Sequence, residues 1–222
     1  MPRVPWLQCS LSVSGFSGAI TPYRRLPCPM LNTLANHSYL PRNRQSVTRQ
    51  MIKDTMVNVF NVGVDAADFL PNQVPEVTTL DYLSTHNFIE HDASLVHYDS
   101  YLGKDPSFVD PMLLANFLGR ANSQGRIGVE EVVTMRKERK QVCEKVKPSC
   151  NLGAKLDTLA FAESSFLLLA MGGDQGESIS KAHAESFLLL KKIPADYKKP
   201  ATDVSSLDIL ATTSKLEVLS VF

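Results

Sequence analysis

The sequence predicts an all-α protein, mainly helical and folded as a single domain. Apolar residues recur at three- and four-residue spacing along most of the chain, which is typical of helices with one buried face, and the alternation of half-buried strands is almost absent. The 222 residues are 44% hydrophobic, enough for one core of ordinary size. We expect one helical domain over residues 23–222, preceded by a poorly defined N-terminal arm or degenerate leader over residues 1–22.

Each expected helix has its own local signals. The first begins at Pro29, because a helix start does not need the amide hydrogen that proline lacks, and ends in a turn after Asn36. The second covers residues 46–60. The third covers residues 129–140, where apolar residues on one face and mixed charges on the other predict a surface helix with a solvated charged side. The strongest covers residues 156–171 and is followed by two glycines, which commonly end helices.

The charge and hydropathy of the chain exclude two classes of partner. Lys and Arg number 23 and Asp and Glu number 23, so no net field attracts nucleic acid or an anionic membrane surface. No apolar run approaches the roughly 20 residues that a membrane-spanning helix needs. Residues 4–21 are mildly apolar but are interrupted by Gln and Ser, so they do not form a clear signal peptide.

Four cysteines are too few for a disulfide framework in a chain of this length. Cys9 and Cys28 have no obvious partner by spacing. Cys143 and Cys150 could close a small loop in an oxidising compartment, and the sequence leaves that pairing open.

The tripeptide Pro27-Cys28-Pro29 places one cysteine between two rigid residues just before the first expected helix. Each proline fixes its backbone angle φ and lacks an amide hydrogen, so the sulfur is held in a narrow range of directions. Amide groups at a helix N-terminus stabilise a thiolate and lower its pKa, so we expect Cys28 to be ionised at neutral pH and able to bind haem iron. A buried loop cysteine is the alternative that the tripeptide leaves open.

Glu163 interrupts an apolar stripe on the strongest expected helix. The stripe recurs at three- and four-residue spacing and comprises Leu156, Leu159, Ala160, Phe166, Leu167 and Ala170. A carboxyl group on a buried face has a raised pKa, so it can accept and return a proton near neutral pH. The alternative is a glutamate at the edge of the stripe that reaches water.

A polar cluster occupies residues 90–94, Glu-His-Asp-Ala-Ser. If this segment is helical, Glu90 and Ser94 lie one turn apart and present hard oxygen ligands that suit magnesium. Asp92 is placed to accept the ring N–H of His91, which would fix the tautomer and raise the pKa of that histidine. A polar helix start, where the dipole favours acidic residues, is the alternative.

Together these segments resemble the haem-thiolate peroxidases, the family of fungal chloroperoxidase and the short-chain unspecific peroxygenases. That family carries Pro-Cys-Pro running into Leu-Asn-x-Leu-Ala-Asn-His, which residues 27–37 match. It carries Glu-His-Asp with a serine two residues on, as residues 90–94 do. Its late helix has a glutamate before Ser or Thr, an apolar run and Met-Gly, as residues 163–172 do. The resemblance covers the chain from about Tyr23 to the C-terminus.

The resemblance implies a chloroperoxidase-like helical fold around haem b. Cys28, flanked by Pro27 and Pro29, would be the axial thiolate and push electron density toward the iron to favour cleavage of the O–O bond of hydrogen peroxide. Glu163 would be the acid–base group that takes the peroxide proton and delivers it to the departing oxygen. His91 would position and tune Glu163. The long-chain branch uses an arginine seven residues before the glutamate, a position that is leucine here, so the histidine version fits.

The resemblance also implies a second metal ion. Glu90, Ser94 and the backbone carbonyl of His91 would hold magnesium beside a haem propionate, and Asp92 would fix His91 through its ring nitrogen. The sequence departs from the family at residues 96–97, where Val-His replaces a more usual Ser-Arg pair, and this leaves propionate binding in doubt.

The activity implied is that of a haem-thiolate peroxidase or peroxygenase that uses hydrogen peroxide, without a reductase, to oxidise a small organic substrate, with halide oxidation also open. Phe88, Phe161 and Phe166 are candidates for an apolar substrate channel, although aromatic residues at helical spacing are also typical of a plain core. A peroxidase dedicated to one secondary metabolite and a catalytically silent haem-binding relative are the alternatives. The family implies secretion, with an intracellular location as the alternative, and the sequence leaves monomer and homodimer open.

Overall fold

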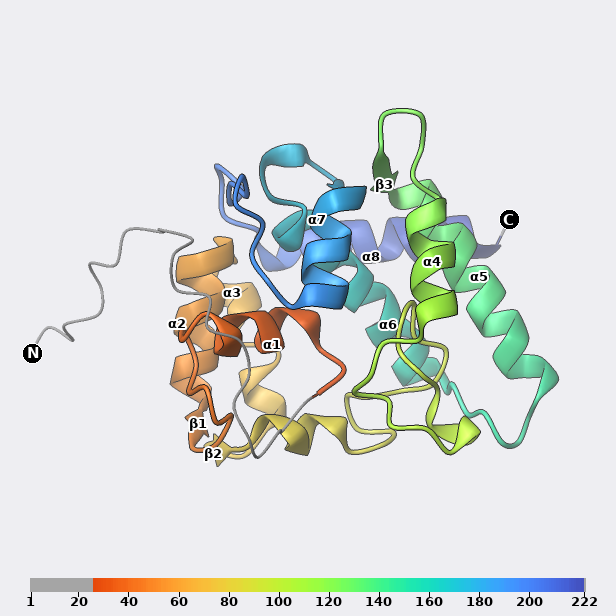
Figure 1. Cartoon of the computed structure of the whole chain (residues 1–222), viewed down its shortest axis with the longest axis horizontal. Helices are drawn as coiled ribbons and strands as arrows, with labels where there is room; N and C mark the ends of the chain where they lie inside the picture. Colours follow the sequence, from red (N-terminus) through yellow and green to blue (C-terminus); the bar gives the residue numbers. More distant parts are fainter. Residues whose placement is uncertain (1–25, 222) are drawn as a thin grey trace, which may run out of the picture.

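The computed structural model describes residues 26–221 and confirms a mainly helical protein (Figure 1). The segment predicted to be an N-terminal arm, with Cys9, lies outside the described residues. Within the described range the α-helices are α1 (Pro29–Asn36), α2 (Arg49–Phe60), α3 (Val64–Ala67), α4 (Pro111–Gly119), α5 (Val129–Lys145), α6 (Ala154–Phe166), α7 (Lys181–Glu185) and α8 (Ser206–Val221). None of these helices is long and apolar enough to cross a membrane.

Strand content in the described range is small and lies in two separate antiparallel pairs. β1 (Val47–Thr48) pairs with β2 (Val77–Thr78), and β3 (Arg126–Gly128) pairs with β4 (Ser178–Ser180). Short 3-10 helices and single π-turns connect the larger elements; the former are Pro71–Gln73, Leu80–Ser84, Ser100–Leu102 and Gly173–Gln175, and the latter are Leu167–Met171 and Ser186–Leu190.

The expected helices occur with shifted ends. The second begins at Arg49 instead of residue 46, because the preceding residues form β1 and the Thr48 hydroxyl caps the helix by accepting the Met51 amide at 3.1 Å. The third extends beyond residue 140 to Lys145. The strongest is continuous from α6 into the π-turn that ends at Met171.

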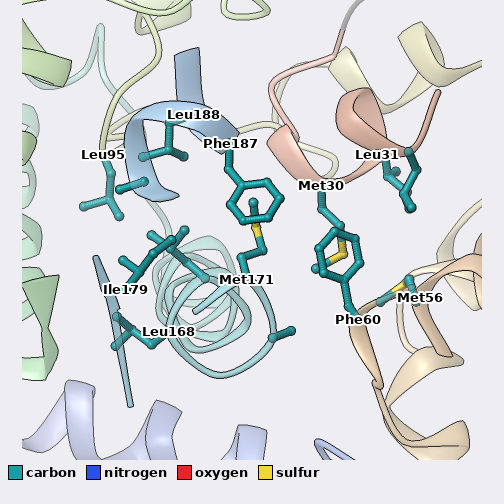
Figure 2. Packing of buried hydrophobic residues seen from close by; sticks show 14 of the residues in the cluster. Met30, Leu31, Met56, Phe60, Leu95, Leu168, Met171, Ile179, Phe187 and Leu188 are labelled. Atoms are coloured by element: carbon teal, nitrogen blue, oxygen red, sulfur yellow. The ribbon is translucent and has the colours of Figure 1, made fainter. Parts of the chain in front are cut away.

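The main core lies between α1, α2, α6 and the π-turn that follows α7 (Figure 2). Met30 from α1 and Phe60 from α2 point toward each other, and Phe187 lies beside Met171 from the end of the strongest helix. The rings of Phe60 and Phe187 are 5.9 Å apart, and both contact Tyr197 edge-on. Aromatic contacts of this kind add to the stability that burial provides, so they fix the end of α2 against the π-turn that follows α7 and against Tyr197.

Gly172 occupies a position that admits no side chain. A Cβ there would lie 2.2 Å from the carbonyl oxygens of Leu168 and Ser178, and both of these are backbone atoms. We therefore expect Gly172→Ala to lower the free energy of unfolding by about 3 kcal/mol. Gly119→Ala is the control, since a Cβ at the end of α4 meets nothing within 4 Å. Urea unfolding with equal midpoints for the two variants would contradict this account.

Cys143 and Cys150 form a disulfide, which settles the pairing that the sequence leaves open. The bridge is buried in a small cluster with Ala93, Leu152 and Leu156, so it ties the end of α5 to the segment that leads into α6. We expect serine at both positions to lower the free energy of unfolding by about 2–3 kcal/mol, because the unfolded chain loses a covalent constraint. A reducing agent should lower the urea midpoint of the wild type and leave the double variant unchanged.

Candidate active site

Cys28 is the N-cap residue of α1, and Pro29 is the first residue of the helix. Its thiol is free and half-buried. The backbone amides of Leu31 and Met30 bond to the sulfur, as expected at a helix N-terminus. Asn32 fixes the segment before the helix, because its side-chain amide donates to the Leu26 carbonyl at 2.6 Å. The tripeptide therefore presents one sulfur at a defined helix end.

The expectation that Cys28 is ionised at neutral pH is wrong for the protein without haem. Burial raises the pKa of the thiol to about 11, and the nearby charge of Glu163 adds to this effect. The amides of Leu31 and Met30 and the charge of Lys191 lower the pKa but do not outweigh burial. Because iron binds thiolates rather than thiols, haem held by this sulfur would require loss of the thiol proton.

The residues that end α1 hold the helix in place. The side-chain amide of Asn36 donates to the Lys191 carbonyl at 3.0 Å, and the Arg44 guanidinium donates to the Asn36 side-chain oxygen at 2.6 Å. Nε2 of His37 accepts the Ile193 amide at 3.1 Å. The Asn-His pair of the motif thus has a structural role, tying α1 to the chain that follows the second π-turn.

Glu163 and His91 come together from different parts of the chain. Nε2 of His91, in the loop before the 3-10 helix Ser100–Leu102, lies 3.4 Å from a carboxylate oxygen of Glu163 on α6. His91 is buried, whereas 45% of the Glu163 side chain is exposed. The prediction that Glu163 lies on a buried face is therefore wrong, and the alternative of a glutamate at the edge of the stripe is correct.

The hydrogen bonds of His91 define where protons can lie. Nδ1 lies 2.6 Å from the Asp92 backbone carbonyl, which can only accept, so Nδ1 carries a hydrogen. A neutral imidazole would then present a bare Nε2 to a carboxylate, and these two acceptors can bond only if a proton lies between them. Burial opposes protonation of His91, but the hydrogen bond and the charge of Glu163 outweigh it and raise the pKa of His91. Glu163 and His91 therefore act as one proton-sharing pair.

Asp92 orients His91 through its backbone and not through its carboxylate. One carboxylate oxygen accepts the Tyr101 amide at 3.4 Å, and the other lies 3.8 Å from Nε2 of His86. The expectation that the Asp92 side chain fixes the His91 ring is wrong, because the backbone carbonyl of Asp92 accepts the hydrogen bond from Nδ1 of His91. The backbone carbonyl, like a carboxylate, keeps the hydrogen of His91 on Nδ1.

The segment that carries Glu90 and Ser94 is a loop, so their expected helical spacing is wrong. The two Glu90 carboxylate oxygens face Nδ1 of His86 at 2.7 Å and the Ser100 hydroxyl at 3.2 Å, and the Ser94 hydroxyl accepts the His97 amide at 3.2 Å. No group of three or more His, Cys, Asp or Glu in residues 26–221 is arranged to hold a metal ion. The predicted magnesium donors include a serine hydroxyl and a backbone carbonyl, which lie outside that set of residue types, so the magnesium site stays a prediction.

Two arginines behind this loop are not anticipated from the sequence. Arg136 and Arg139 were expected on the solvated side of the third helix, yet they are 6% and 7% exposed. Arg139 donates to the Ser94 carbonyl at 2.8 Å and forms an ion pair with Asp99. The sequence did contain a signal for this burial, because both arginines lie at helical spacing from the buried Val132.

The three phenylalanines proposed to line a channel are in different places. Phe161 lies on the side of α6 opposite Glu163, as expected two residues along a helix, and borders a groove of about 510 Å³ against α5 and α8. It does not share a helix face with Glu163, and its role in a substrate channel stays a prediction. Phe166 shares the face of Glu163 at three-residue spacing and is partly buried, while Phe88 packs edge-on against Tyr82.

The donor chemistry of this site fits a haem group. Cys28 supplies a free thiol at a helix N-terminus, and Glu163 supplies a partly exposed carboxylate whose charge acts on that thiol. A soft sulfur ligand suits iron, and a carboxylate beside the same space can move protons. Cys28 would hold the iron of such a group, which would supply redox chemistry, and Glu163 would move protons beside it.

Comparisons with known proteins agree with the site. The family described as "Peroxidase, family 2" matches residues 15–202. The chain is 29% identical over 169 residues to an aromatic peroxygenase of Coprinellus radians, which is 64% of this chain and 64% of that protein. It is 25% identical over 202 residues to an aromatic peroxygenase of Cyclocybe aegerita, 78% of this chain and 54% of that one. A stretch of 46 residues is 48% identical to the dothistromin biosynthesis peroxidase of Dothistroma septosporum, 21% of this chain and 11% of that one.

The chain spans less than two thirds of the length of each of these relatives. The family match, in contrast, covers most of the chain and includes Cys28, the loop of His91 and Glu163. The chain therefore belongs to peroxidase family 2, the haem-thiolate chloroperoxidase and peroxygenase family.

Proposed function

We propose that this protein is a haem-thiolate peroxygenase that uses hydrogen peroxide to oxidise a small organic substrate. The observation that carries the proposal is the pairing of Glu163 with His91 at 3.4 Å, together with a free thiol at the start of α1 on which the charge of Glu163 acts. Family membership supports peroxidase chemistry, and the similarity to two aromatic peroxygenases supports an organic substrate. Haem bound by Cys28 would supply the redox chemistry.

The protein's own residues would manage protons. Glu163 would accept a proton from hydrogen peroxide and deliver it to the oxygen that leaves as water. His91 would share that proton through Nε2, and the Asp92 carbonyl would hold its ring in one orientation. Because 45% of the Glu163 side chain is exposed, a small reactant can reach the carboxylate.

Oxygen-18-labelled hydrogen peroxide tests the proposal with the haem-loaded protein and a simple aromatic substrate. We expect labelled oxygen in the product, because a peroxygenase transfers an oxygen atom from the peroxide. Coupled radical products without label would indicate one-electron peroxidase chemistry instead. Absence of haem uptake, or of peroxide consumption by the loaded protein, would overturn the proposal.

A second candidate is a peroxidase dedicated to one secondary metabolite. The 46-residue stretch shared with the dothistromin biosynthesis peroxidase favours it. Both candidates use the same residues at Cys28, His91 and Glu163, so they differ only in substrate range. Turnover of a panel of unrelated aromatic and aliphatic compounds would favour the peroxygenase, and turnover of a single polycyclic class would favour the biosynthetic enzyme.

A further inference from the structure

We propose that Arg136 is a positioning residue for Glu163, supplying a buried positive charge beside the carboxylate and tying the His91 loop to α6. This inference rests on the proposed function and deepens it, because it assigns a role to a buried residue that would act through Glu163 and His91. The observation behind it is a single guanidinium that bonds to both elements of the proton-sharing pair.

The hydrogen bonds of Arg136 join the two elements directly. Nη1 donates to the Ala93 carbonyl at 3.0 Å, two residues after His91 in the chain. Nε donates to the Ser164 hydroxyl at 3.2 Å, on the residue that follows Glu163. A planar guanidinium fixes its donors in one geometry, so the loop and the helix cannot shift independently.

The charge of Arg136 is buried and is not neutralised by a direct ion pair within residues 26–221. Both of its acceptors are neutral oxygens. Glu163, Asp157 and Asp99 are the carboxylates whose charges act on it, and Arg139 is the cation beside it. A buried cation of this kind is costly unless nearby anions compensate for it. Glu163 is the leading compensating group, so the two side chains attract each other.

The ionisation states are consistent with this role. Burial lowers the pKa of Arg136 to about 10, so the guanidinium still carries its charge at neutral pH. Its charge also opposes the rise in the pKa of His91 that Glu163 causes. Arg136 thus places a fixed positive charge next to the pair that would handle the peroxide proton.

Three variants of the haem-loaded enzyme test the charge. Arg136→Gln removes the charge but keeps a donor for the Ala93 carbonyl, Arg136→Lys keeps the charge, and Lys145→Gln removes an exposed charge from the same helix as a control. We expect the glutamine variant at Arg136 to react with hydrogen peroxide about tenfold more slowly, with an unchanged KM for the organic substrate. The lysine variant should stay within about threefold of the wild type, and the control should be unchanged.

A binding measurement gives a readout that does not depend on turnover. Hydrogen cyanide must give up its proton to bind ferric haem as the anion, so its affinity reports on the same proton acceptor. Titration followed at the Soret band should show about tenfold weaker cyanide binding in Arg136→Gln and near wild-type binding in Arg136→Lys. Equal rates and equal cyanide affinities in these two variants would overturn the inference.

Glu163→Gln separates failure of this inference from failure of the proposed function. A Glu163→Gln variant as fast as the wild type overturns the function itself, whereas a slow Glu163→Gln beside an unimpaired Arg136→Gln overturns only the role of Arg136. Thermal unfolding checks that each variant folds. Should Arg136→Gln not fold, Ser164→Ala keeps the charge and releases its Nε bond; we expect reaction with peroxide to slow about two- to fivefold, and an unchanged rate overturns the inference.

Discussion

Replacement of Cys28 by alanine is expected to abolish the strongly red-shifted Soret band of the reduced, carbon monoxide-bound protein. That shift arises when a thiolate is the axial ligand of haem iron, and Cys28 is the free cysteine of the described chain. Met30 and Leu31 keep their amides directed at this point, so the helix end stays intact while the ligand is lost. Visible spectra of wild type and variant, reduced under carbon monoxide, provide the measurement.

The double serine variant at Cys143 and Cys150 is the matched control, because it removes two sulfur atoms away from the proposed ligand. It should keep the red-shifted band even though its stability is lower. A band that persists in Cys28→Ala would mean that another residue binds the iron. An unshifted band in the wild type would favour a silent haem-binding relative over an enzyme.

Local motifs in the sequence were enough to predict the ligand helix. Proline on both sides of Cys28 and a proline-initiated helix after it depend only on neighbouring residues, and the structure has a helix there over Pro29–Asn36. The ionisation of the thiol depends on tertiary burial, which no local motif contains. The helix end does lower the pKa of Cys28, but burial by distant residues outweighs it.

Around Glu163, too, the sequence predicted some features correctly and missed others. Periodicity predicted the helix that carries Glu163 but placed the Glu163 side chain on a buried face. The stripe of seven positions is wider than the part of the helix that neighbouring elements bury. The magnesium prediction assumed a helix at Glu90 and Ser94, but the segment is a loop, so their four-residue separation does not give a helical turn. Arg136 was missed because charged side chains are rarely buried, and its contacts with Ala93 and Ser164, together with nearby carboxylates, depend on the tertiary fold.

Glu163→Gln is expected to lower kcat/KM for hydrogen peroxide by about 10²–10⁴-fold, the range that a general acid–base group contributes. Glutamine has nearly the same shape and can still donate or accept a hydrogen bond to His91, so the site should keep its structure. Glutamine cannot accept a proton at neutral pH, so the peroxide proton must be transferred to water instead. The side chain is 45% exposed, but its charge compensates the buried charge of Arg136, so the unfolding temperature should fall modestly and is measured beside the rate.

Glu185→Gln, the same chemical change at an exposed position of α7, serves as the control and should leave the rate unchanged. Initial rates at varied peroxide and fixed organic substrate measure the effect. The kinetic constant that changes distinguishes two possible roles of Glu163. A loss confined to KM for the organic substrate would mean that Glu163 only shapes a binding pocket. A loss in the peroxide step with an unchanged red-shifted band would assign the proton transfer to Glu163, because the thiolate would still be bound and only the proton acceptor would be missing.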